Sequence, residues 1–106
     1  MVTDTAPRRA QQRYGIEIPI EVRHEGAVIA TTTQNISLGG MFIGLTEPLP
    51  FGAKVHLVFS LPDLPEPLEV DAHVRWLQAG VGVGVQFAGL RAREVWALQR
   101  LFAAHE

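Results

Sequence analysis

Three arginines near the start of the chain could bind an anion. They are Arg8, Arg9 and Arg13. Arg9 and Arg13 are four residues apart, a spacing that places both guanidinium groups on one side of the segment whether it is helical or extended. Three cations this close repel one another unless an anion lies between them. The group is therefore either a solvated basic turn or one part of an anion-binding site.

A second polar group follows in the stretch Asn35-Ile36-Ser37-Leu38-Gly39-Gly40. On an extended strand, the amide of Asn35 and the hydroxyl of Ser37 point to one face, and the apolar residues of the stretch point to the other. The two glycines remove side chains where the backbone turns or where another group approaches closely. Taken alone, the stretch fits both the seat of a small molecule and a capped turn.

Six runs of alternating apolar and polar residues predict the strands that position these groups. The runs cover residues 16–22, 27–33, 41–45, 54–59, 68–76 and 81–87. Glycine and proline separate most of them, and Pro19 places an edge or a bulge in the first. The alternation excludes a parallel sheet buried on both faces. We therefore expect an all-β fold, a six-stranded antiparallel barrel, followed by one C-terminal helix.

The same alternation predicts which side chains face the core. In the fifth run it places Trp76 inside and Arg75 outside, and in the sixth it places Val81 inside. Gly82 and Gly84 then form a bare outer face, which either admits a helix or a neighbouring backbone or only allows the barrel to curve.

Apolar residues at helical spacing predict the final helix over residues 90–104. No Ser, Thr, Asp or Asn precedes it, so Gly89 is the best N-cap that the sequence offers. We expect both Trp76 and Trp96 to be core residues rather than a platform for a ligand.

Composition limits the possible functions. The chain has 106 residues, no cysteine, 47% hydrophobic and 19% charged residues, and a net charge of −2. It therefore fits one ordered domain without disulfides or thiolate chemistry. Residues 1–13 carry a local charge of +2, and the remainder, with six basic and ten acidic residues, carries −4. No apolar run approaches a membrane span and no signal peptide is recognised, so we expect a soluble cytoplasmic protein.

Together, the two polar groups resemble the signature of the PilZ domain family. That signature is Arg-x-x-x-Arg before the first strand and Asp/Asn-x-Ser-x-x-Gly after the second, matched here by residues 9–13 and 35–40. Residues 74–76 and 82–87 are also similar to the last two strands of the family. The likeness extends from Arg8 to about Phe102, nearly the whole chain.

The resemblance implies a bacterial receptor for the second messenger cyclic di-GMP that needs no cofactor and no metal. It implies phosphate and guanine contacts from Arg9 and Arg13, and a barrel side formed by Asn35, Ser37 and Gly40. Many members carry aspartate at the position of Asn35. A carboxylate accepts two hydrogen bonds from guanine and an amide accepts one, so we expect at most weaker binding. In the family, an arginine at the position of Arg8 accompanies binding of two stacked ligands.

This interpretation divides the chain into a flexible arm, residues 1–14, and a barrel with its helix, residues 15–106. Ligand would order the arm and change the surface shown to an effector protein, with the chain a monomer or a ligand-linked dimer.

Two alternatives stay open. One is a PilZ-type adaptor that binds protein and no nucleotide. The other, a barrel for single-stranded nucleic acid, is disfavoured by the acidic body. We expect no enzyme, because the histidines are scattered and Ser37 has no activating base nearby in sequence.

Overall fold

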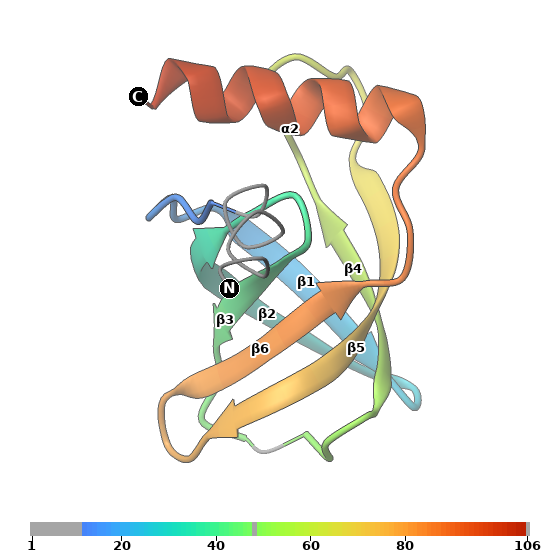
Figure 1. Ribbon diagram of the computed structural model, residues 1–106. Coiled ribbons are helices and arrows are strands. Elements are labelled where there is room, and N and C mark those ends of the chain that lie inside the picture. The colour runs from blue at the N-terminus through green and yellow to red at the C-terminus, as the bar shows by residue number, and fades with distance from the viewer. Residues whose placement is uncertain (1–11, 48, 106) are drawn as a thin grey trace, which may run out of the picture.

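Six antiparallel strands close into a barrel in the computed structural model, which describes residues 12–47 and 49–105 (Figure 1). The strands are β1 (Pro19–His24), β2 (Ala27–Ile36), β3 (Gly40–Gly44), β4 (Lys54–Phe59), β5 (Leu68–Gln78) and β6 (Gly82–Phe87), and helix α2 spans Ala92–Ala104. Around the barrel they follow the order β1-β2-β3-β6-β5-β4. The predicted six-stranded barrel with a C-terminal helix is confirmed.

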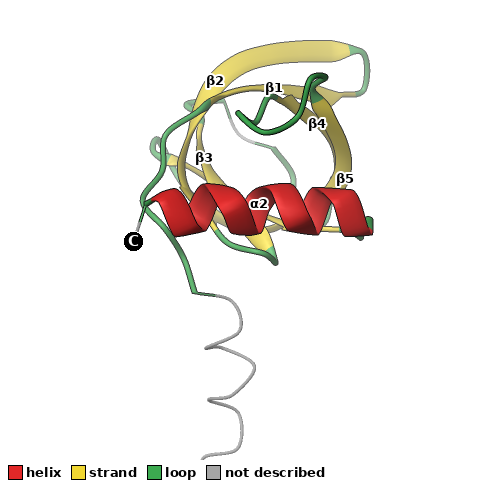
Figure 2. Cartoon of the chain, turned by 90° about the horizontal axis from the view of Figure 1, so that it is seen from above, coloured by secondary structure: helices red, strands yellow, loops and turns green. Residues whose placement is uncertain are grey.

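The inward faces of the strands form one apolar core. Its fully buried members include Val22, Ile36, Met41, Leu57 and Val74, which come from β1 to β5. Helix α2 lies across one end of the barrel (Figures 1 and 2), and its apolar face joins the same cluster through Ala97, Leu98, Leu101 and Phe102. The helix therefore closes one end of the barrel, as its apolar periodicity requires.

The prediction that Gly89 caps this helix is wrong. The N-cap is Arg91, and the buried carboxylate of Glu94 accepts a hydrogen bond from the Arg91 backbone N–H at 2.8 Å. The second carboxylate oxygen of Glu94 accepts another from Nε of Arg91 at 3.0 Å. An acidic residue at the third helical position thus provides half of a capping box, although no Ser or Thr provides the other half.

Three residues placed in the core are exposed instead. The pairing of β5 with β6 shifts between Val74 and Trp76, because Arg75 is inserted as a bulge. After the bulge Trp76 emerges on the outside, with 46% of its surface exposed. Val81 lies just before β6 and is 42% exposed, and Trp96 lies on the outer face of α2. A period of two cannot reveal an inserted residue, which explains the error at Trp76.

Replacing Glu94 with alanine should destabilise the protein by about 1–2 kcal/mol, because the first turn of α2 loses its capping carboxylate. Urea unfolding followed by circular dichroism measures this. Gln99→Ala, on the exposed face of the same helix, is the matched control and should change stability by less than about 0.5 kcal/mol. Equal effects of the two substitutions would contradict the role given to Glu94.

Candidate functional site

A backbone contact outside the strands positions the end of the arginine-rich segment. Tyr14 donates its N–H to the carbonyl of Ile36 at 2.8 Å, and Ile36 donates back to the carbonyl of Tyr14 at 2.9 Å. The Tyr14 ring also stacks on Phe102 of α2, with centroids 4.4 Å apart and planes 7° from parallel. Since Asn35 and Ser37 flank Ile36, this bridge brings Arg13 beside both.

The Arg13 guanidinium contacts three side chains from two different strands and the turn after β2. Its Nε donates to Oδ1 of Asn35 at 2.7 Å, and Nη1 lies 3.5 Å from Oγ of Ser37. It also lies over the indole of Trp76, 5.7 Å from the ring centroid, in cation–π geometry. Partial burial lowers the pKa of Arg13, yet a guanidinium stays charged at neutral pH. A fixed cation therefore stands between polar groups and an aromatic face.

Ser37 shapes the turn that follows β2. Its N–H donates to the carbonyl of Gly40 at 2.8 Å, and its Oγ accepts hydrogen bonds from the N–H groups of Gly39 and Gly40 at 3.1 and 3.2 Å. The residue is fully buried. The capped-turn interpretation is therefore correct for Ser37, whose hydroxyl is already engaged by the backbone and reaches Arg13 only at the limit of hydrogen-bond distance.

Gly40 is required by the packing of β3 against β6. A Cβ at this position would lie 2.0 Å from the carbonyl oxygen of Val85, a backbone atom that cannot move away alone. The absence of a side chain thus permits strand pairing at the floor of the site, Gly40 with Gln86. Strand packing alone therefore explains why this residue is glycine, whether or not a ligand also uses the space.

The Trp76 indole lies on the bare surface that Gly84 provides. A Cβ on Gly84 would come within 2.5 Å of the indole, and the ring of Phe42 packs at 5.9 Å from that of Trp76. The glycines of β6 thus accommodate aromatic rings rather than a helix. Gly82 allows both a neighbouring backbone and a ring to approach, because a Cβ there would lie 2.2 Å from the carbonyl oxygen of Ile43 and 2.8 Å from the ring of Phe42. The alternating glycines indicate in the sequence that a bulky neighbour covers β6, but they do not identify Trp76 as that neighbour.

A pocket of about 230 Å³ adjoins these groups. It is lined by Arg13, Gly39, Gly40, Arg75, Trp76, Val85 and Gln86. Arg75 donates from Nε to Oε1 of Gln86 at 2.8 Å, so a second guanidinium is held in the lining of the pocket. Two cations, an aromatic ring and a glycine floor suit a flat, anionic ligand with hydrogen-bonding edges.

The structure brings Arg13 together with Asn35, Ser37 and Gly40, although more than twenty residues of sequence separate Arg13 from the other three. Arg8 and Arg9 lie outside the described residues. Trp76, Arg75 and Gln86 were not recognised as candidate site residues from the sequence, because the bulge that exposes Trp76 is visible only in the pairing of β5 with β6.

The exchange Gly40→Ala should destabilise the barrel by about 2–4 kcal/mol, because the new methyl group collides with the backbone of β6. Thermal or urea unfolding measures the loss. Gly15→Ala, where no atom lies within 4 Å of the added carbon, is the control and should have a far smaller effect. A stable Gly40→Ala variant would show that β3 and β6 can separate there without cost.

The family model of the PilZ domain matches residues 7–104. No curated protein matches the chain. Among the described residues, no helix is long and apolar enough to span a membrane.

Two solved structures share the fold. The PilZ domain of CeSA from a cellulose-synthesizing bacterium has 22% identity and a TM-score of 0.69, over 90% of this chain and 99% of that one. The Bacillus subtilis inhibitor of motility, MotI/DgrA, has 20% identity and a TM-score of 0.70, over 93% of this chain and 54% of its own. The chain thus spans about half of MotI/DgrA. With the family model matching almost its whole length, this chain belongs to the PilZ domain family.

Proposed function

We propose that this PilZ domain is a receptor for cyclic di-GMP that signals by changing the surface it presents to a partner protein. The observation that carries the proposal is the Arg13 guanidinium, held by Asn35 and lying over Trp76 at the mouth of an open pocket. A guanidinium that only stabilised the fold would not need an exposed indole and a second arginine beside it. The family membership supports the same ligand class.

Each group in the pocket has a partner on such a ligand. A guanidinium grips phosphate oxygens, or the O6/N7 edge of guanine, through two parallel hydrogen bonds. The exposed ring of Trp76 offers a guanine base a stacking surface, a contact worth about 1–3 kcal/mol for bases on aromatic side chains. The Asn35 amide, which accepts from Arg13 through Oδ1, keeps its two N–H donors for O6 or N7 of the base.

The ligand has two phosphates, and the described pocket holds only the cations of Arg13 and Arg75. Arg8 and Arg9 precede Arg13 by only a few residues of sequence, and the proposal assigns the further cations to them. In the proposed mechanism these arginines close over the bound ligand from the side of the arm. The changed surface is then what an effector protein in the cytoplasm detects.

Calorimetry with purified protein tests the proposal. Cyclic di-GMP should bind, whereas GMP, cyclic GMP and a short oligonucleotide should not. Arg9→Ala and Arg13→Ala should abolish detectable binding, since each removes a charge-assisted bidentate contact. Asn35→Ala and Trp76→Ala should weaken binding by about tenfold or more, because each removes about 1–3 kcal/mol of contact. Arg23→Ala, an exposed arginine paired with Glu21 on β1, is the matched control and should bind normally.

Two outcomes of this titration decide between alternatives. No heat with any ligand, from a protein shown to be folded, would favour a PilZ-type adaptor that binds protein and no nucleotide. Two ligands per chain would support the role assigned to Arg8, a third cation for a stacked pair of ligands. One ligand per chain would contradict the role assigned to Arg8 and would be consistent with a single-ligand site around Arg13.

A further inference from the structure

Strand β2 is unpaired on one side along half of its length. Strand β2 has ten residues and β3 has five, and β3 pairs with β2 only between Thr33 and Ile36. The preceding residues 27–31 pair with β1 on one side. On their other side, no strand among residues 12–47 and 49–105 continues the ladder. The nominally closed barrel therefore contains an open strand edge.

The direction of the hydrogen bonds shows which backbone groups are available there. Thr33 donates its N–H to the carbonyl of Ile18, on the β1 side. Alternate residues of a strand direct their N–H and C=O groups to the same edge. Val28 and Ala30 therefore direct theirs away from β1, where no described residue bonds to them. Such a row of unpaired donors and acceptors is a template for another strand.

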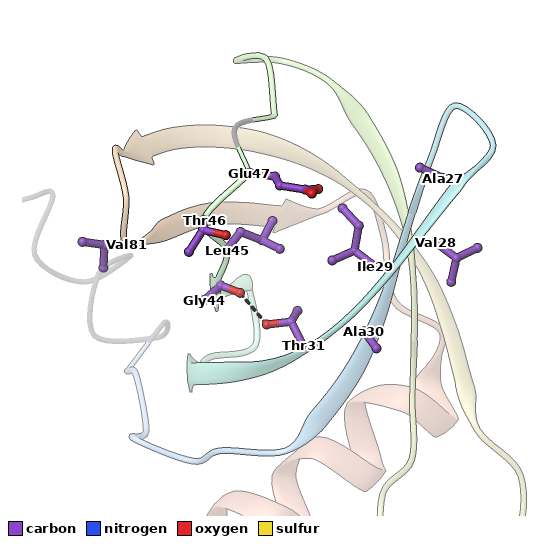
Figure 3. A pocket seen from close by; sticks show the side chains of 10 residues that line it. All are labelled: Ala27, Val28, Ile29, Ala30, Thr31, Gly44, Leu45, Thr46, Glu47 and Val81. Carbon is purple, nitrogen blue, oxygen red and sulfur yellow. Dashed lines mark hydrogen bonds between the residues drawn. The ribbon is translucent and has the colours of Figure 1, made fainter.

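A groove of about 690 Å³ runs along this edge (Figure 3). Residues 27–31 form one wall, and residues 44–47 with Val81 form the other. Ile29, Leu45 and Glu47 extend into the space between the two walls (Figure 3). At the end toward β3, the Thr31 hydroxyl donates to the carbonyl of Gly44 and closes the gap.

The open edge lacks the usual protection against pairing. Exposed edges are normally blocked by charged residues or proline. Residues 27–31 read Ala-Val-Ile-Ala-Thr and contain neither, whereas β1 carries Pro19 and three ionisable residues. Val28 is 58% exposed, and Val81 on the facing wall is also exposed. An unprotected edge beside exposed apolar side chains indicates a place where a partner binds.

The charge of the groove selects its occupant. Among its lining residues, Glu47 is the only charged one, and it has no ion-pair partner among the described residues. Residues 14–106 carry a net charge of −4. A second copy would place one acidic body against another, with two copies of Glu47 in a shared groove. A basic segment would instead gain charge complementarity.

We propose that this groove binds an extended segment of a partner protein, apolar and basic in alternation, which adds a strand to β2 beside Val28 and Ala30. Main-chain hydrogen bonds provide the affinity, and contacts with Ile29, Leu45 and Glu47 provide the selectivity. The inference concerns a protein-binding surface and does not depend on nucleotide binding. The same two strands, β2 and β3, also carry the turn of the candidate ligand site at their other ends.

Amide hydrogen exchange by NMR, with no nucleotide present, tests the surface directly. In the free protein, the amides of Val28 and Ala30 should exchange at least about tenfold faster than those of Ile29 and Thr31, which face β1. A ten-residue probe peptide of alternating valine and lysine should slow the exchange of both exposed amides by about tenfold or more. The same peptide with glutamate in place of lysine should leave them unchanged.

Two variants make the test specific. Ala30→Pro removes an N–H that faces away from β1, so the barrel should fold while the valine–lysine peptide binds at least about tenfold more weakly. Ala30→Ser keeps the N–H and should bind normally. Glu47→Lys should reverse the preference, so that the glutamate peptide binds and the lysine peptide does not.

Several results would overturn the inference. Slow exchange at Val28 and Ala30 in dilute, peptide-free protein would show that the edge is already paired. Resonance shifts from the peptide confined to another surface would place the partner elsewhere. Protection that rises with protein concentration, together with elution as a dimer, would identify a second copy of the chain as the occupant. Because nucleotide is absent throughout, failure here leaves the proposed cyclic di-GMP binding untouched.

Discussion

The short bridge between Tyr14 and Ile36 holds the two halves of the candidate site together. Its two backbone hydrogen bonds and the stacking of Tyr14 on Phe102 join the end of the arginine-rich segment to β2 and to α2. A segment with few apolar residues has little else to bury, so without this bridge Arg13 would have no fixed position. The bridge fixes one guanidinium beside Asn35 and leaves its remaining donors available for a ligand.

The aromatic side of the site depends on a different constraint, the matching of a bulge in β5 to a glycine in β6. The Arg75 bulge turns Trp76 out of the core, and Gly84 on β6 leaves the surface on which the indole lies. The bulge alone would be unfavourable, because without the bare surface at Gly84 the outward indole would be fully exposed to solvent. Together they create a flat, half-exposed ring directly beside a fixed cation, which is a suitable surface for a purine base.

The two ends of β2 differ in their pairing, and unequal strand lengths explain why. Near Asn35 the strand is paired on both sides and carries polar groups of the candidate site. Near Val28 it is paired on one side only, because β3 is half as long. The unequal lengths thus leave one end of β2 paired on both sides and the other end with an open edge.

Strand number, the antiparallel barrel and the final helix could be predicted from the sequence, because a period of two and a period of 3.6 are local signals. The family signature also predicted that Arg13 would lie close to Asn35 and Ser37, as it does. Trp76, the cap formed by Glu94 and the open edge of β2 could not be predicted. Trp76 and the edge of β2 depend on register, through one inserted residue at Arg75 and one short partner strand. The Glu94 cap is a local contact with Arg91, and the Ser or Thr that marks such a cap in a sequence is missing here. Register is set by pairing between distant segments, so only the tertiary structure decides it.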